Sequence, residues 1–200
     1  MFKKALPVFM LAESPVHVGS GTELGLVDLP IQREKHTGFP KIESSGIKRC
    51  LREAFESPAV KEKLKKDIGN GSADDGRVKK LIEQVFGPER GDLHSGALGF
   101  TDGRLIAFPV KSMKGVFAWI TCPHVLVRLR DELDLAGIGL PELPRENTVT
   151  EQSAVTFDRD GEPSRVVLEE YTFQVKKDAS CTELASWLAK AVFKTGDGGG

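Results

Sequence analysis

Apolar residues recur at helical spacing in several stretches of the chain, and each such stretch predicts an amphipathic helix. In the first stretch, Ser44 or Ser45 can cap a helix that ends at Pro58, with Ile47 and Leu51 on its apolar face. The other predicted helices cover residues 61–68, 77–86, 123–136 and 182–192, the last with Thr182 as its cap. Helices therefore occupy much of the predicted fold.

Short or alternating apolar runs between these helices predict strands. The first strand is predicted at 5–12, and Asp102-Gly103 between the runs 97–100 and 105–108 predicts a hairpin. Another strand is predicted at 116–120. Two more, at 148–157 and 165–175, are joined by the polar region 158–163 into a protruding hairpin. Helices interspersed with antiparallel strands are typical of an α+β domain.

The composition fits a single globular domain in a reducing compartment. The 200 residues are 40% hydrophobic, and no apolar run approaches the ~20 residues of a membrane span. Cys50, Cys122 and Cys181 lack paired spacing, so neither a disulfide framework nor a zinc site is indicated and a cytoplasmic location fits. The net charge of −1 argues mildly against a nucleic-acid binder, although basic residues gather between 33 and 52.

Residues 18–52 combine glycines, one isolated carboxylate and several basic side chains between two apolar segments. The glycine-rich start fails two nucleotide-binding patterns, because Leu24 stands where a dinucleotide fingerprint needs glycine and no Gly-Lys-Ser/Thr follows. Asp28 is the isolated carboxylate, just before Leu29-Pro30. A lone loop aspartate most often serves a turn or a cap, and the residues alone leave that alternative open.

The predicted helix after Ser44 carries a basic face. Lys48 and Arg52 lie one turn apart and can reach the same anion, and Arg49 adds a third cation. Such a face on an amphipathic helix is more often a solvated surface than a binding site. The pattern alone therefore leaves both interpretations open.

A series of ordered motifs gives the chain a family resemblance. They are His17-x-Gly19-Ser20-Gly21-Thr22-Glu23-Leu24-Gly25, Val27-Asp28-x-Pro30-Ile31-Gln32-Arg33-Glu34, His36-Thr37-Gly38-Phe39-Pro40, Val85-Phe86-Gly87-Pro88 and Phe108-Pro109-Val110-Lys111-Ser112-Met113-Lys114-Gly115-Val116. In their order and spacing, the chain resembles the backbone subunits of type III-B CRISPR (Cmr) effector complexes, which belong to the RAMP superfamily. The resemblance covers nearly the entire chain.

The resemblance implies one RAMP domain over residues 1–200. Its fold would be a ferredoxin-like, RNA-recognition-type palm with inserted helices and a β-hairpin thumb at about 148–175. Such subunits stack along a CRISPR guide RNA with further copies of themselves and with other Cmr subunits. They cleave complementary target RNA as metal-dependent endoribonucleases, with magnesium or manganese as the expected cation. Family chains continue past residue 200, so we expect this chain to be truncated at its C-terminus.

The resemblance also implies roles for particular residues. Asp28 would be catalytic, as a holder of a hydrated cation or as a proton acceptor. The expected RNA-binding residues are Lys48, Arg52, Arg49, Ser45 and Arg33, and those expected to order the loop are His17, Gly19 and Gly21. Two alternatives remain: a non-catalytic RNA scaffold, in which Asp28 is only a loop cap, and a nucleotide-binding enzyme using the glycine-rich loop.

Overall fold

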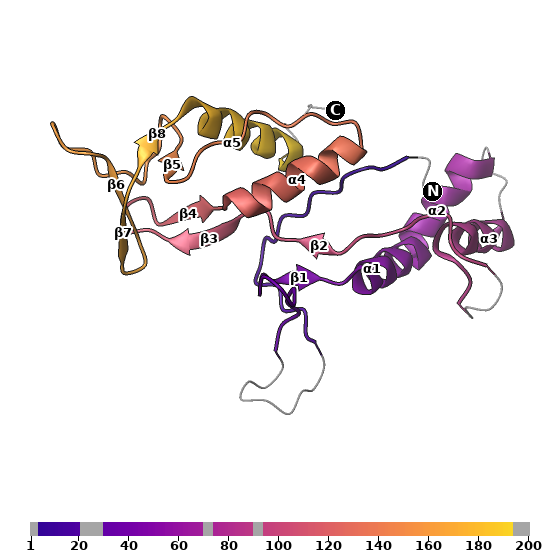
Figure 1. Cartoon of the computed structure of the whole chain (residues 1–200). Coiled ribbons are helices and arrows are strands. Elements are labelled where there is room, and N and C mark those ends of the chain that lie inside the picture. The colour runs from indigo at the N-terminus through magenta and orange to yellow at the C-terminus, as the bar shows by residue number, and fades with distance from the viewer. Residues whose placement is uncertain (1–3, 21–29, 70–73, 90–93, 194–200) are drawn as a thin grey trace. The chain divides into compact units, whose positions relative to one another are not determined.

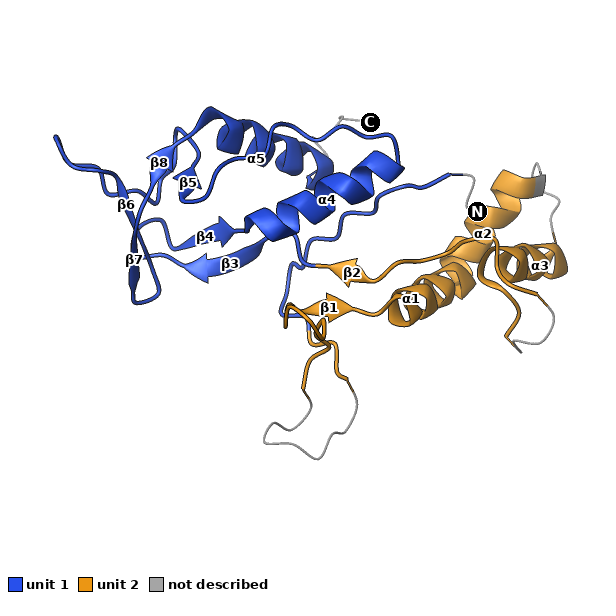
Figure 2. Cartoon of the chain, viewed as in Figure 1, with its two compact units in different colours: residues 1–16, 105–200 blue, residues 17–104 orange. Residues whose placement is uncertain are grey.

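The structure, a computed structural model, describes residues 4–20, 30–69, 74–89 and 94–193. The described residues form a mixed α/β fold with five helices and small two-stranded sheets (Figure 1). The chain divides into two compact units, coloured separately in Figure 2. Unit 1 comprises residues 1–16 and 105–200, and unit 2 comprises residues 17–104. Every residue expected to form the site belongs to unit 2.

The described residues of unit 2 form a short antiparallel sheet and three helices. β1 (Lys41–Ile42) pairs with β2 (Gly103–Arg104) and leads directly into α1 (Ser44–Glu56). α2 (Pro58–Gly69) and α3 (Asp75–Phe86) follow. All three helices were predicted from hydrophobic spacing and are confirmed, with shifts of a few residues at their ends.

The core of unit 2 forms on one face of α3. Val78, Ile82 and Phe86 follow helical spacing on this face, and all three are buried. The ring of Phe86 stacks on Phe100 with centroids 6.0 Å apart and meets Phe55 of α1 edge-on at 5.4 Å. These contacts attach both α1 and the segment before β2 to α3.

Unit 1 contains three strand pairs and two helices. Its elements are β3 (Phe108–Lys111), β4 (Phe117–Ile120), α4 (Pro123–Leu135), β5 (Thr148–Val149), β6 (Arg165–Leu168), β7 (Tyr171–Gln174), β8 (Lys176–Lys177) and α5 (Ala179–Val192). β3 pairs with β4 and β6 with β7 in antiparallel fashion, whereas β5 and β8 are parallel. The hairpins β3–β4 and β6–β7 also touch, because the Met113 N–H donates to the Val167 carbonyl at 3.1 Å.

The helices of unit 1 confirm the predicted helical segments. α4 starts at Pro123, as predicted, and Val125, Leu126, Leu129 and Leu133 form its buried stripe. The N-cap of α5 lies four residues earlier than predicted, because Asp178 rather than Thr182 caps the helix by accepting from the Cys181 N–H at 3.1 Å. No helix in the described part of the chain is both long and apolar enough to span a membrane.

Two of the predicted strand arrangements are wrong. Residues 5–12 are irregular, Leu6, Val8 and Met10 are exposed, and the apolar run pairs with no strand among the described residues. Asp102-Gly103 is not a hairpin turn, because Gly103 lies in β2 and pairs with β1 instead. Strand pairing depends on partners distant in sequence, which a local apolar run cannot reveal.

The predicted strands 148–157 and 165–175 also need correction. Of the first, 148–149 form a strand that pairs with β8, and its last residue, Phe157, forms an isolated antiparallel bridge with Arg165 across the predicted polar turn. The second region is itself a hairpin of β6 and β7, turning at Glu169 with a backbone φ of 50°. The hairpin observed within the predicted 148–175 region therefore spans 165–174.

The close approach of Gly96 to α3 predicts a sharp effect of substitution. A Cβ on Gly96 would lie 2.5 Å from the backbone carbon of Phe86 and 2.6 Å from the Val85 carbonyl oxygen. Since backbone atoms cannot yield cheaply, Gly96→Ala should lower the free energy of unfolding by roughly 1–3 kcal/mol in urea denaturation.

Gly46→Ala provides the matched control, because a Cβ at Gly46 would meet nothing within 4 Å and the position is helical. This variant should be as stable as the wild type or more stable by up to about 1 kcal/mol. Equal unfolding midpoints for Gly96→Ala and the wild type would contradict the close packing of Gly96.

Candidate functional site

The two ends of the segment that contains Asp28 are held together by backbone hydrogen bonds. The Ser20 N–H donates to the Pro30 carbonyl at 2.9 Å, and the Gln32 N–H donates to the Val18 carbonyl at 2.8 Å. Gly19 and Ile31 face each other in an antiparallel bridge between these bonds. Asp28 and Gly21 themselves lie outside the described residues. The described flanks bring Ser20 and Pro30, the residues on either side of 21–29, next to each other.

A tight turn follows the loop base. Arg33 and Pro40 form an isolated antiparallel β-bridge. Between them, Gly38 adopts a φ of 73°, a left-handed conformation that glycine tolerates well. The Arg33 side chain donates to the Gly38 carbonyl at 2.8 Å, so the turn itself engages one of its donors. Arg33 is exposed and keeps further N–H groups, and its expected RNA contact stays a prediction.

The start of α1 receives its hydrogen-bond acceptors from distant segments. The Ser44 N–H donates to Asp102 Oδ1 at 2.9 Å, and the Glu43 N–H donates to Gln32 Oε1 at 2.9 Å. Glu43, the residue at the N-cap position, makes no side-chain cap hydrogen bond. The predicted capping by Ser44 or Ser45 is therefore wrong, since the acceptors come from Asp102 and Gln32.

Asp102 is held as a carboxylate by the same contacts. The Ser44 N–H and then the Lys41 ammonium, 3.0 Å from Oδ2, hold the pKa of Asp102 below its ordinary value. Because the pKa of Asp102 is lower in the folded than in the unfolded protein, its carboxylate stabilises the fold at pH values above the ordinary aspartate pKa. This contribution is lost as the pH falls through the folded pKa.

The cationic side chains of α1 differ in whether they already form hydrogen bonds or ion pairs within the protein. Arg52 is largely engaged, because its Nε pairs with Glu56 at 2.9 Å and its Nη1 donates to the Gly87 carbonyl at 2.8 Å. Lys48 and Arg49 form no hydrogen bond or ion pair with any described residue. The structure thus leaves Lys48 and Arg49 as the available cations, while Arg52 ties α1 to the end of α3.

The remaining predicted site residues lie on α1 and at the loop base. Ser45 is exposed in the first turn of α1. His17 lies beside Gly19, with its ring Cε1 3.7 Å from the position that a Cβ on Gly19 would occupy. A Cβ at Gly19 would make ordinary van der Waals contact with the imidazole, and the expected loop-ordering role of both residues stays a prediction.

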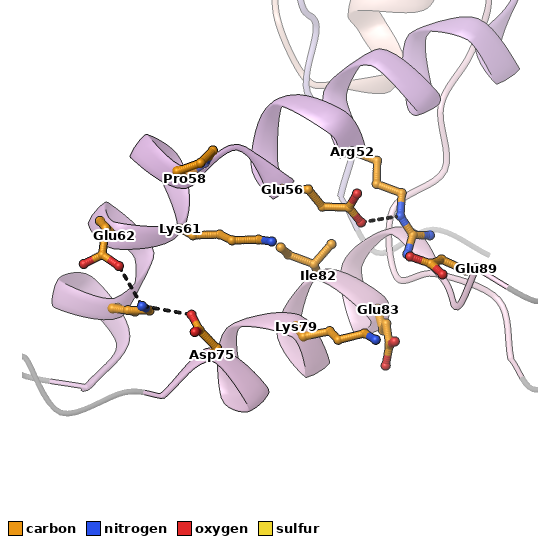
Figure 3. Close-up of a pocket in the computed structure, with 11 residues that line it drawn as sticks. Arg52, Glu56, Pro58, Lys61, Glu62, Asp75, Lys79, Ile82, Glu83 and Glu89 are labelled. Carbon is orange, nitrogen blue, oxygen red and sulfur yellow. Dashed lines mark hydrogen bonds and ion pairs between the residues drawn. The ribbon is translucent and has the colours of Figure 1, made fainter.

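A hollow of about 540 Å³ lies among α1, α2 and α3 (Figure 3). Its lining mixes both charges: Arg52 pairs with Glu56, and Lys65 contacts Glu62 at 2.6 Å and Asp75 at 2.9 Å. These two carboxylates raise the pKa of Lys65 above its ordinary value. Since acids balance the cations, this hollow is poorly suited to an extended anion.

A metal site can be tested only on the described side chains. Among residues 4–20, 30–69, 74–89 and 94–193, no three His, Cys, Asp or Glu side chains converge as ligands. Magnesium often binds through one or two carboxylates together with substrate phosphates. Asp28, the carboxylate expected to hold a cation, lies outside these ranges.

Comparison with known proteins identifies the family. Residues 10–191 match the RAMP superfamily. The chain belongs to the RAMP superfamily. This RAMP chain is 37% identical over 182 residues to the CRISPR system Cmr endoribonuclease Cmr4 of Pyrococcus furiosus. The aligned region covers 88% of this chain and 54% of that protein.

Solved structures agree with the family assignment. A crystal structure of oligomeric Cmr4 from Pyrococcus furiosus matches with a TM-score of 0.58 and 29% identity, covering 90% of this chain and 59% of that one. Another Cmr4 crystal structure gives a TM-score of 0.59 and 32% identity, covering 88% and 56%. The RAMP chain thus spans little more than half the length of these relatives.

A more distant structure agrees in fold alone. It is a type III-B Cmr-beta complex bound to cognate target RNA, and one of its chains matches with a TM-score of 0.57 at 17% identity. The match covers 84% of this RAMP chain and 57% of that one.

Sequence reasoning missed two residues that organise the site. Asp102 was interpreted as part of a turn, because Asp-Gly between apolar runs favours one. Gln32 was treated only as one member of a polar run. Neither role has a local signal, since each depends on a contact with the start of α1 from at least eleven residues away.

The pKa shift of Asp102 leads to a prediction. Asp102→Asn keeps an oxygen for the Ser44 N–H but loses the charge that attracts Lys41, so stability at neutral pH should fall by up to about 1 kcal/mol. The gap between variant and wild type should narrow as the pH falls through the ordinary aspartate pKa and then through the lowered pKa of folded Asp102, where the carboxylate becomes protonated. Urea unfolding midpoints across this range measure both effects.

Asp160→Asn is the control, because Asp160 is exposed and forms no ion pair among the described residues. It should unfold like the wild type at neutral pH. If the stability gap of Asp102→Asn stays constant down to low pH, the charge of Asp102 has no part in stabilising α1.

Proposed function

We propose that this chain is the backbone subunit of a type III-B CRISPR effector complex and cleaves target RNA complementary to a bound guide. The 37% identity to the Cmr endoribonuclease of Pyrococcus furiosus over 88% of this chain carries the proposal. Its partners are the guide RNA, the target RNA, further copies of the chain and other Cmr subunits. A reducing cytoplasm suits the three free cysteines.

The N-terminal half of α1 is the proposed guide-binding surface. Lys48 and Arg49 are the cations there that no described residue neutralises. The positive end of the helix dipole adds to their attraction for phosphate, and Ser45 lies exposed in the same turn. Contacts of this kind recognise backbone and leave the choice of sequence to guide–target pairing.

The finer architecture of the proposal is a ferredoxin-like palm with a thumb formed by the β6–β7 hairpin. Support comes from this hairpin's exposed aromatic residues, since Tyr171 is 61% and Phe173 41% exposed on β7. Aromatic faces can stack on bases regardless of sequence. Such a thumb would displace one nucleotide of the guide–target duplex.

The proposed reaction is attack of a target 2′-hydroxyl on the neighbouring phosphate, which forms a P–O2′ bond and breaks the P–O5′ bond. The 2′-hydroxyl loses its proton, the departing 5′-oxygen gains one, and the products are a 2′,3′-cyclic phosphate and a 5′-hydroxyl end. A displaced nucleotide can place the 2′-oxygen in line with the scissile bond, and such alignment lowers the barrier by several kcal/mol. Asp28 would orient the reacting groups from its loop. A divalent cation, magnesium or manganese, would stabilise charge on the phosphate. The described residues contain no group of side chains that could hold it.

Replacing the loop carboxylate tests the enzymatic role. In an assembly reconstituted with guide RNA, Asp28→Ala should reduce target cleavage at least a hundredfold while guide affinity changes less than about twofold, because one loop carboxylate adds little to phosphate binding. Gel-based single-turnover cleavage and filter binding measure the two quantities.

Asp160→Ala, in an exposed turn of unit 1, is the matched control and should cut like the wild type. Wild-type cutting by Asp28→Ala would remove this residue from the mechanism. A wild-type assembly that binds guide and target yet never cuts would favour the scaffold alternative.

Replacing the two free cations tests guide binding. Lys48→Ala with Arg49→Ala should weaken guide binding equally for unrelated sequences. It should also make the slope of log K against log salt shallower by about 0.7 for each phosphate that the variant no longer neutralises. Binding isotherms at several salt concentrations give this slope.

Lys63→Ala with Lys66→Ala is the control, since both lysines lie exposed on α2 and outside the proposed surface. It removes the same net charge and should leave the slope nearly unchanged. Equal reductions of affinity in the two double variants, or a reduction confined to one guide sequence, would argue against a phosphate-binding role for α1.

A further inference from the structure

The tip of the β3–β4 hairpin is joined to one end of β6. The Met113 N–H donates to the Val167 carbonyl at 3.1 Å, and Ser112 faces Leu168 in an antiparallel bridge. Ser112 is buried, and its hydroxyl donates to the Lys114 carbonyl at 2.8 Å. The C-terminal end of β6 is therefore held by the backbone of this tip.

A side chain of the same tip reaches the segment beside the other end of β6. The Lys114 ammonium donates to the carbonyl of the buried Thr156 at 2.6 Å and lies 5.6 Å from the centre of the Phe157 ring, within the range of a cation–π contact. Phe157 in turn exchanges two backbone hydrogen bonds with Arg165, the first residue of β6, at 2.8 Å and 3.1 Å. Residues 112–114 thus connect to both ends of a four-residue strand.

The tip keeps one shape although its backbone is strained. Gly115 and Val116 adopt φ values of 80° and 71°, and the second value is unfavourable for a β-branched residue. The turn closes through the Ser112 N–H, which donates to the Val116 carbonyl at 2.9 Å. Strain of this kind persists only where the surrounding contacts outweigh it. The contacts of Ser112 and Lys114 have this effect, so the tip is a rigid support for β6.

We propose that Lys114 is a positioning residue that holds the β6–β7 hairpin in one orientation, so that this thumb displaces a nucleotide at one fixed step of the guide–target duplex. This inference rests on the proposed function. With the backbone bonds near Val167 alone, the two hairpins would be joined at one end of β6 and could pivot against each other. The Lys114 contacts at the other end remove this freedom.

The physical consequence is a well-defined position of the displaced nucleotide. Displacement is opposed by the stacking and pairing of the duplex, so the thumb has to direct its contacts at a single step. A thumb that pivots divides these contacts among neighbouring steps. Guide binding is proposed to depend on α1, which belongs to unit 2 and does not include Lys114. Loss of the Lys114 contact should therefore change where nucleotides are displaced and leave guide affinity unchanged.

Two substitutions at Lys114 and one control isolate this contact. Lys114→Met keeps the length of the side chain and its packing on Phe157 but removes the charged donor. Lys114→Arg keeps a cation with N–H donors and should restore the contact with the Thr156 carbonyl. Lys111→Met is the control, because Lys111 is exposed on β3 and its side chain forms no ion pair or hydrogen bond with any described residue. It removes the same charge from the same hairpin.

The test uses the assembly with guide RNA and target strands that carry 2-aminopurine at successive positions, because this base fluoresces more strongly when it is unstacked. The other target sugars are 2′-fluoro, which lack the attacking hydroxyl. In the wild type, fluorescence should be high at one step for each bound copy of the chain and low at the neighbouring steps. Lys114→Met should lower this ratio about fivefold, the factor that one net hydrogen bond contributes to an equilibrium.

The other measurements separate positioning from a general loss of structure or charge. Lys114→Arg and Lys111→Met should give ratios close to that of the wild type. Guide affinity and the unfolding temperature of the assembly should stay close to wild-type values in all three variants. If guide affinity falls together with the ratio in Lys114→Met, or if Lys111→Met lowers the ratio equally, Lys114 has no specific positioning role.

The wild type decides between failure of this inference and failure of the proposed function. If the wild type displaces a nucleotide at one step and Lys114→Met does so with the same ratio, the positioning role is wrong and the proposed function stands. A wild-type assembly that binds guide and target without raised fluorescence at any step would overturn the proposed thumb and this inference together.

Discussion

The start of α1 depends on hydrogen-bond acceptors that the helix does not contain. The first N–H groups of any helix lack intrahelical partners, and here the N-cap side chain of Glu43 does not serve them. Asp102 and Gln32 supply the acceptors instead, one from the strand β2 region and one from the loop base. The same contacts that stabilise α1 therefore bring the loop base, β1 and β2 to one place, so local helix stability and the geometry of these described segments share one cause.

The elements predicted well are those whose signal is local. The buried stripe of α4 follows from helical spacing alone, and Pro123 marks its first turn without reference to any other segment. Strands cannot be predicted from local spacing in this way, because a strand exists only where another segment pairs with it. The apolar run 5–12 has the composition of a strand without a described partner, whereas Gly103, which resembled part of a turn, pairs with Ile42.

The candidate site could be predicted in its residue types but only partly in their use. Sequence spacing placed Lys48 and Arg52 on one helical face, and the structure confirms the helix. It could not show that the Arg52 guanidinium would donate a hydrogen bond to the Gly87 carbonyl, 35 residues away. The partner Glu56 was visible at i,i+4 spacing, and this spacing is a signal that a cation is already paired.

The net charge of −1 is a poor guide to this chain because its acids neutralise selected cations. Asp102 pairs with Lys41, Glu56 with Arg52, and Asp75 with Lys65. Each of these cations helps to fasten segments of unit 2, and each is unavailable as a free charge. Lys48 and Arg49 have no such partner among the described residues, so α1 keeps two unpaired positive charges although the net charge of the chain is negative. Phosphate responds to such local charge within about a Debye length, so a nearly neutral protein can still offer the proposed guide-binding surface on α1.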